Sequence, residues 1–335
     1  MKKISVFSAF GFLAALFLLA CASPLFADSA RNKKALDEFK QIVSTRYIYK
    51  DYKKVHWPSL YAKHEYKILA SATDREFAEN LNGLVLELKD AHFSVMDGEG
   101  ARLPSLKRPA RVTNYNLNAI RRIIGNLTKL NEHVSVGKLG KVGYLMITDW
   151  DFPPDEYADI LPKSLFSETF FGTGGLIVDV RMNHGGKVAN CERFAGEFAS
   201  ANLLAAYHHS LDRSGNIVKK EYYLRGLGVR YAKPVIVLMG NMSASACEHF
   251  ILQMQTVAHV KTMGDNSAGS TGLPRNYRLS NGIGLTIPSA ALMDLKNTYI
   301  EGYGIKPRET VPFIRDKSDN VLVKAFQKLG ERVID

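Results

Sequence analysis

The sequence contains 335 residues, 46% of them hydrophobic, and its 44 basic and 33 acidic side chains give a formal net charge of +11. This length and apolar content support a large core, which we expect to be divided between a small and a large domain. The charge suits contact with acidic surfaces, but no tract is typical of nucleic-acid binders, so we expect no nucleic-acid partner. Three cysteines are too few for a disulfide framework, although Cys191 and Cys247 could form one bridge in an oxidising compartment.

The first 27 residues have the pattern of an export signal. Two lysines precede an apolar run at residues 7–20, and small residues follow, so signal peptidase is expected to cut after Ala27. The run is short for a transmembrane helix. An alternative is a lipobox that ends at Cys21, which would make the mature chain a membrane-anchored lipoprotein. Either way we expect a periplasmic or extracellular protein, with membrane contact only if Cys21 is lipidated.

Residues 28–90 are predicted to form an N-terminal helical bundle. Thr73 and Glu76 have the spacing of a capping box, which marks a helix start. Apolar residues then recur on one face of that helix, namely Phe77, Leu81, Leu84 and Leu88. The pattern changes to a short strand at residues 93–96, so the second domain is expected to span residues 91–335.

A basic segment follows, with no acidic residue between positions 101 and 130. It is either a solvated face or a patch that attracts an acidic substrate or a membrane surface. Its cations are Arg102, Lys107, Arg108, Arg111, Arg121, Arg122 and Lys129.

From residue 141 onward, strand-like and helix-like patterns alternate. This alternation predicts an α/β (α+β) fold with a mixed or parallel sheet covered on both faces. The expected strands are residues 142–148, 176–181, 219–225, 235–239 and 277–287, the last with a turn at 280–282, and the expected helices are 155–166, 188–199 and 321–333.

The segment 234–255 joins a strand to a helix through a turn that contains Ser245. A serine at a helix N-terminus lies beside free backbone N–H groups and the positive end of the helix dipole, which favour a developing anion. A nucleophilic serine in acyl transfer needs that setting. The alternative is an ordinary serine N-cap.

Several other motifs lack a residue or a position that their function requires. The glycines at 172–175 precede a strand, whereas a dinucleotide fingerprint follows one. Gly185-Gly186-Lys187 is followed by Val188 and so lacks the hydroxyl of a phosphate-binding loop. The nine histidines show no zinc-ligand spacing. We therefore expect no metal and no cofactor.

Six segments occur in order along the chain: 88–92 (LKDAH), 141–148 (KVGYLMIT), 176–186 (LIVDVRMNHGG), 235–248 (VIVLMGNMSASACE), 264–269 (GDNSAG) and 301–307 (EGYGIKP). With these segments the sequence resembles the tail-specific (C-terminal processing) protease family, especially the branch with the tricorn protease core and the retinoid-binding repeats. The resemblance implies a helical domain followed by a mixed-sheet catalytic domain with a crotonase-like core.

The resemblance also assigns roles to individual residues. Ser245 matches the nucleophile, and the N–H of Ala246 with one from the Gly185-Gly186 turn would form the oxyanion hole. One branch of the family uses a lysine as the base, but Ser270 stands at that position, which excludes a Ser–Lys dyad.

The tricorn-like branch instead uses a histidine and a glutamate, which match His92 and Glu301. An imidazole titrates near neutral pH and can take the serine proton, while a carboxylate fixes its tautomer. The resemblance thus implies an exported serine peptidase acting on peptides or proteins.

Two alternatives to a peptidase remain. The first is a catalytically silent ligand- or peptide-binding module on the same fold, and the second is a basic surface-binding protein. Retention of all three catalytic residue types favours the enzyme. Lys306 and Arg308, beyond Glu301, are either cations for a peptide C-terminal carboxylate or part of a solvated loop.

Overall fold

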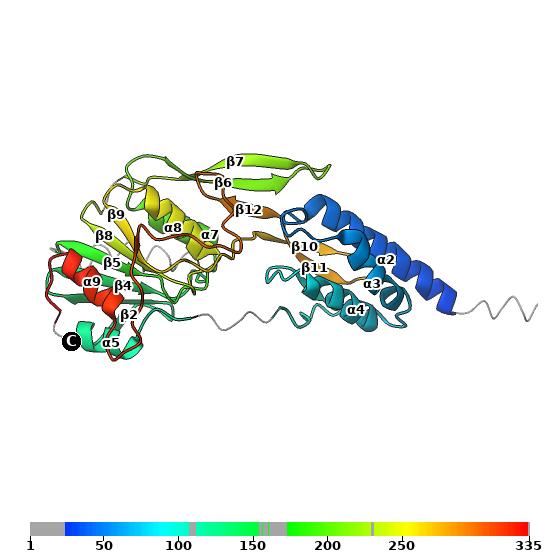
Figure 1. Ribbon diagram of the computed structural model, residues 1–335, viewed down its shortest axis with the longest axis horizontal. Coiled ribbons are helices and arrows are strands. Elements are labelled where there is room, and N and C mark those ends of the chain that lie inside the picture. The colour runs from blue at the N-terminus through cyan, green and yellow to red at the C-terminus, as the bar shows by residue number, and fades with distance from the viewer. Residues whose placement is uncertain are drawn as a thin grey trace, which may run out of the picture. The chain divides into compact units, whose positions relative to one another are not determined.

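The computed structural model describes residues 24–106, 112–153, 156, 160, 173–228 and 231–333. The chain divides into two compact units (Figure 1). One contains the described residues up to Leu106 together with Arg275–Ile287, and the other contains the rest. We call them the helical unit and the sheet unit and describe each by itself. No helix among the described residues combines the length and apolarity needed to cross a membrane.

The helical unit begins with three helices, α2 (Pro24–Arg46), α3 (Trp57–Leu69) and α4 (Asp74–Glu87). The hydroxyl of Thr73 caps α4 by accepting the Glu76 N–H at 3.1 Å, and the Glu76 carboxylate reaches back to the Ala72 N–H at 2.9 Å. The apolar face of α4 is buried, as its spacing predicts. The predicted helical pattern of residues 28–90 is therefore present.

A small antiparallel sheet completes the helical unit. Its strands are β1 (Ser94–Met96), β11 (Gly284–Pro288) and β10 (Pro274–Arg278), in the order β1-β11-β10. Val95 pairs with Leu285 in the antiparallel register. The unit therefore joins the predicted helical domain to a hairpin from the far end of the sequence.

The sheet unit is built on a seven-stranded mixed sheet with the order β13-β9-β8-β5-β4-β3-β2. The five strands from β13 to β4 are parallel to their neighbours, whereas β3 and β2 are antiparallel. The strands are β2 (Thr128–Lys129), β3 (Val134–Leu139), β4 (Val142–Ile147), β5 (Gly175–Asp179), β8 (Val235–Met239), β9 (Val260–Gly264) and β13 (Glu309–Thr310).

Helices cover both faces of this sheet (Figure 1). Alternate residues of each central strand point to opposite faces, so Val178 packs in one core and Ile177 in the other. The first core includes α7 (Val188–Gly196) and α8 (Ala246–Thr256), and the second includes α5 (Leu117–Ile124) and α9 (Asn320–Lys328). Strands buried on both faces explain the continuous apolar runs of the sequence.

A second sheet lies in the same unit, with the order β12-β6-β7. It combines a long hairpin, β6 (Leu203–Leu211) and β7 (Ile217–Leu224), with β12 (Ala290–Met293). All its pairings are antiparallel. Its β7 corresponds to the strand predicted at 219–225.

A buried ionic network ties the end of β5 to the start of α9. The guanidinium of Arg181 is fully buried and contacts Asp179 at 2.6 Å and Asp319 at 2.9 Å. Burial opposes its charge, but the two carboxylates more than offset this and raise the pKa of Arg181. The hydroxyl of Tyr144 donates to Asp179 at 2.8 Å. The network holds the segment that leads from β5 to Gly185.

The mixed α/β fold class expected from the sequence is confirmed. Three expectations lie outside the described residues: most of the export signal including Cys21, most of the helix at 155–166, and the cations Lys107, Arg108 and Arg111. Of the other basic residues, Arg121 and Arg122 lie in the last turn of α5.

Candidate active site

Four loops converge at one edge of the seven-stranded sheet. Strands β4, β5, β8 and β9 are parallel neighbours, so the loops after their carboxyl ends emerge on the same side. The loop after β5 carries Gly185 and Gly186, the loop after β8 carries Ser245, and the loop after β9 carries Ser270. The strand order therefore brings together loops that are up to 85 positions apart in the sequence, from Gly185 to Ser270.

Ser245 forms a sharp corner between β8 and α8. Its backbone has φ 55° and ψ −121°, a conformation that costs a residue with a side chain free energy. Two backbone contacts hold this corner: the Ser245 N–H donates to the Ser270 carbonyl at 2.9 Å, and the Ala244 N–H donates to the Asn183 carbonyl at 3.0 Å. The corner thus presents a half-buried serine at the first turn of a helix.

Gly185 packs directly against this corner. A side-chain carbon at Gly185 would lie 2.8 Å from the Ser245 Cβ and 3.3 Å from the Ala246 nitrogen, and its φ of +119° also requires glycine. The Gly185 N–H donates to Asn183 Oδ1 at 2.9 Å. Within the described residues, no hydrogen bond uses the N–H of Ala246 or Gly186. Ala246 and the Gly185-Gly186 turn therefore lie together beside Ser245.

Glu248 anchors the corner from inside. Its carboxylate is fully buried and accepts the N–H groups of Ser245 at 3.1 Å, Ser270 at 2.8 Å and Gly269 at 2.7 Å, and the hydroxyl of Ser267 at 2.6 Å. Burial raises the pKa of Glu248, and these hydrogen bonds oppose the rise. The carboxylate therefore joins the start of α8 to the loop after β9.

Glu301 lies in a loop that packs against the same segment. Its side chain is 7% exposed, and Oε2 accepts the Thr271 N–H at 3.0 Å. The Gly302 N–H donates to the Gly269 carbonyl at 2.9 Å. Thr271 follows Ser270, whose carbonyl accepts the Ser245 N–H. The Glu301 carboxylate is therefore connected to the serine corner through Thr271 and Ser270.

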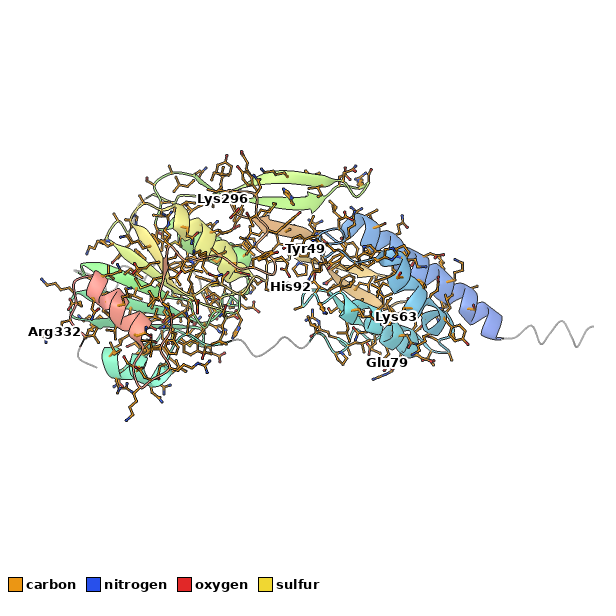
Figure 2. All side chains as sticks on the ribbon, in the orientation of Figure 1. Tyr49, Lys63, Glu79, His92, Lys296 and Arg332 are labelled. Carbon is orange, nitrogen blue, oxygen red and sulfur yellow. The ribbon has the colours of Figure 1, made fainter. Side chains whose placement is uncertain are left out.

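The sheet unit contains Ser245, Ala246, Gly185, Gly186 and Glu301. His92 belongs to the helical unit (Figure 2). Its side chain is half-buried. Its N–H donates at 2.9 Å to the carboxylate of Asp90, which is buried and also accepts the Tyr47 hydroxyl at 2.9 Å. The backbone at His92 is therefore held by a buried acceptor at the end of the helical bundle.

The remaining candidates for other chemistry are structural. Cys191 and Cys247 are free thiols, both buried, and burial raises their pKa values. A buried thiol with a raised pKa is a poor nucleophile, so Cys247 does not compete with Ser245. Among the described residues no group of three His, Cys, Asp or Glu side chains could hold a metal ion.

Two residues that hold the serine corner, Glu248 and Asn183, are not among the site residues predicted from the sequence. Glu248 has the S-x-x-E spacing from Ser245 that signals a capping box, and this signal could have identified it. Asn183 also organises the site, because its side chain holds the Gly185 N–H and donates to the Ile147 carbonyl at 3.1 Å. The Gly185 contact is a local turn that the Asn-x-Gly spacing could have indicated, whereas the Ile147 contact depends on the neighbouring strand β4.

Comparisons with known proteins identify the family of this chain. The peptidase family S41 model matches residues 141–311, about half of the chain. The matched range contains Ser245, Ala246, Gly185, Gly186 and Glu301 but not His92.

Two curated relatives are similar in sequence. The carboxy-terminal processing protease CtpB of Bacillus subtilis is 25% identical over 232 residues, covering 68% of this chain and 46% of the relative. The nisin-resistance protein of Lactococcus lactis is 26% identical over 167 residues, covering 47% of this chain and 51% of the relative. The chain thus spans about half the length of the curated relatives it matches.

A solved structure shares the fold over nearly the whole chain. It is a candidate peptidase from Parabacteroides merdae, with a TM-score of 0.72 and 21% identity, covering 90% of this chain and 97% of that one. The sequence resemblance to C-terminal processing proteases is therefore confirmed, and this chain belongs to peptidase family S41, a family of serine-type peptidases.

Proposed function

We propose that this chain is an exported serine peptidase that hydrolyses peptide bonds with Ser245 as the nucleophile. The observation that carries the proposal is the strained Ser245 corner at the first turn of α8, packed against Gly185 and the Ala246 N–H. A rigid serine beside unpaired backbone donors suits attack on a carbonyl. A binding module has no need of such a corner.

The oxyanion of the tetrahedral intermediate would be held by the N–H groups of Ala246 and the Gly185-Gly186 turn. Since Asn183 occupies the Gly185 N–H, Gly186 is the donor we assign within that turn. Both donors are backbone groups, so they are already oriented before the reaction and need little reorganisation.

The base we propose is His92, with Glu301 as the residue that orients it. Ser270 occupies the position at which other family members carry a lysine, and its carbonyl and N–H are used to hold the corner. An imidazole would take the proton of Ser245 Oγ as that oxygen attacks the carbonyl carbon, and would return it to the leaving amine. Glu301 would stabilise the imidazolium.

Reaction with a fluorophosphonate probe tests the nucleophile. The wild-type chain should be labelled at Ser245, and Ser245→Ala should abolish labelling. Ser214→Ala is the matched control, because Ser214 is exposed in the turn between β6 and β7 and should leave labelling unchanged. A silent binding module would remain unlabelled in all three chains.

Export is a separate part of the proposal and rests on the pattern of the first 27 residues. Expressed with its own N-terminus in a bacterial host, the protein should reach the exported fraction and lose residues 1–27. Intact mass spectrometry of the purified chain measures this. A lipid-modified Cys21 would replace the soluble product by a lipoprotein, and retention of Met1 would contradict export.

A further inference from the structure

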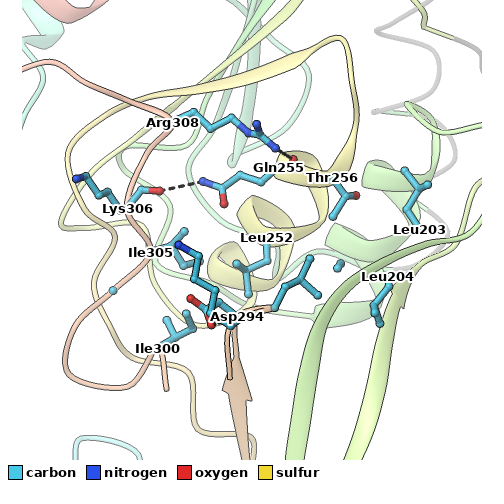
Figure 3. A pocket seen from close by; sticks show the side chains of 14 residues that line it. Leu203, Leu204, Leu252, Gln255, Thr256, Asp294, Ile300, Ile305, Lys306 and Arg308 are labelled. Atoms are coloured by element: carbon cyan, nitrogen blue, oxygen red, sulfur yellow. Dashed lines mark hydrogen bonds between the residues drawn. The ribbon is translucent and has the colours of Figure 1, made fainter. Parts of the chain in front are cut away.

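A second concave site lies in the sheet unit, at the opposite end of α8 from Ser245. It is a cavity of about 610 Å³ between the last turn of α8, the start of β6, the turn after β12 and the segment 300–308 (Figure 3). An 11-residue helix is about 16 Å long, so the cavity is distinct from the serine corner.

Aliphatic side chains form part of the walls of this cavity. Leu203 and Leu204 line it from β6, Leu252 from α8, and Ile300 and Ile305 from the segment that carries Glu301 (Figure 3). Cavities of a few hundred Å³ with mainly apolar walls and a few polar groups are typical of small-ligand sites. An apolar group would therefore be stabilised there.

The charged groups around this cavity are predominantly positive. Lys296, Lys306 and Arg308 line it with one acid, Asp294. Asp294 Oδ1 already accepts the N–H groups of Lys296 at 2.9 Å and Thr298 at 2.8 Å, which closes the turn after β12. The Asp294 carboxylate therefore stabilises the turn after β12.

The three cations differ in the contacts that they already form. The guanidinium of Arg308 donates to the carbonyl of Gln255 at the end of α8. Within the described part of the chain, the ammonium groups of Lys296 and Lys306 form no ion pair. Both side chains are exposed, so two lysines remain available to a ligand at the mouth of an aliphatic cavity.

We infer that this cavity binds an apolar group that carries a carboxylate. The aliphatic walls would take the apolar body, and Lys296 and Lys306 would pair with the anion. Two sources share that chemistry: a free alkanoate and the C-terminal residue of a peptide. Neither depends on Ser245, so the inference goes beyond the proposed peptidase activity.

Calorimetric titration of the full chain carrying Ser245→Ala tests the site without turnover. Decanoate should bind saturably and at least about tenfold more tightly than uncharged decanol. From hexanoate to decanoate the affinity should rise about three- to fourfold per methylene, because each one is buried against the aliphatic walls. Inorganic phosphate, an anion without an apolar body, should bind far more weakly.

Charge reversal locates the anion. Lys296→Glu combined with Lys306→Glu should weaken decanoate binding by about tenfold or more. Lys138→Glu is the matched control: Lys138 is equally exposed, but it lies on β3, four strands from β9 in the sheet, and should leave the affinity unchanged. All these side chains are exposed, and thermal melts of each variant check that folding is preserved.

N-acetyl-leucyl-leucine and its C-terminal amide separate the two sources. Tighter binding of the acid than of the amide, at an affinity near that of decanoate, identifies a peptide end, whereas much tighter decanoate binding identifies a free alkanoate. Either result supports the inference. Absence of saturable binding by both acids, equal affinity for decanol and decanoate, or indifference to the double charge reversal would overturn it.

Discussion

Two neighbouring residues of α8, Glu248 and His249, are both buried, yet their surroundings differ completely. Glu248 faces the loop after β9, and its carboxylate accepts three donors from that loop and the Ser245 N–H. His249 faces β6 and β7, where its ring meets His208 edge-on at 5.3 Å between centroids. One helix thus holds a fully satisfied polar group on one face and an aromatic histidine cluster on another.

The histidine cluster lacks the partners that Glu248 has. Among the described residues, His249 Nδ1 and His208 Nε2 are buried without a hydrogen-bond partner. His208 stacks on Tyr222 at 4.4 Å, and the Tyr222 hydroxyl donates to Glu192 at 2.6 Å. Burial lowers the pKa of His249 to about 3 and that of His208 to about 4.

Burial alone does not define the role of a polar side chain. A buried carboxylate that accepts every available donor becomes an anchor, here for the backbone of Ser245. Buried imidazoles without partners are held neutral and make stability depend on pH.

The largest effect is expected at the proposed reaction centre. Ser245→Ala and His92→Ala should each lower kcat on the order of 10⁴–10⁶-fold, and the double variant little further, because the two residues act as a unit. Steady-state peptide hydrolysis measures this. In the wild type the rate should rise with one ionisation near neutral pH, as expected for an imidazole base. Full activity of His92→Ala would end this mechanism.

Glu301→Gln should lower kcat less than Ser245→Ala or His92→Ala does, on the order of 10⁴-fold at most, because the glutamate only orients and stabilises the imidazole. The side-chain amide oxygen of the variant can still accept the Thr271 N–H, so the melting temperature should change little. A loss of stability as large as the loss of activity would indicate a structural glutamate instead.

Glu248→Gln sharpens the comparison between the two faces. The amide NH₂ would oppose N–H donors that now point at a carboxylate oxygen, so we expect a loss of about 3 kcal/mol in the free energy of unfolding. The fluorophosphonate reaction at Ser245 should also slow, since the corner loses its anchor. Denaturant unfolding supplies the measurement.

The neighbouring variant His249→Leu is the matched control for Glu248→Gln, with the same helix and the same burial. It removes a buried imidazole that lacks a partner, so at pH 8 it should change the free energy of unfolding by less than about 1 kcal/mol. Equal losses for the two variants would show that the contrast between the faces has no energetic meaning.

The last prediction concerns the pH dependence of stability. The unfolded chain protonates histidine near pH 6.5, whereas native His249 resists protonation until about pH 3, so stability falls as the pH drops below about 6.5. Between pH 7 and pH 5 this residue should cost about 2 kcal/mol of unfolding free energy. His249→Leu should remove that part of the slope in urea unfolding at both pH values. An unchanged slope would contradict a neutral buried His249.

The amino-acid sequence by itself determined most of the local structure. The capping box before α4, the β8–turn–α8 segment and the apolar runs of β4 and β5 all appear where the patterns predict, because propensity and burial periodicity are properties of a short stretch. The six ordered segments that resemble the C-terminal processing proteases likewise predicted the family of the chain, which the family match confirms.

Only the tertiary structure decided which segments meet. The strand order places the loop after β5 beside the loop after β8, so Gly185 contacts Ser245 and the Asn183 carbonyl accepts the Ala244 N–H. It also decides that Cys191 and Cys247 stay as buried free thiols. The two faces of α8 also differ because of the tertiary structure. The partners of Glu248 and His249 come from strands and loops that lie far from α8 in the sequence, since parallel neighbouring strands are joined through long connections.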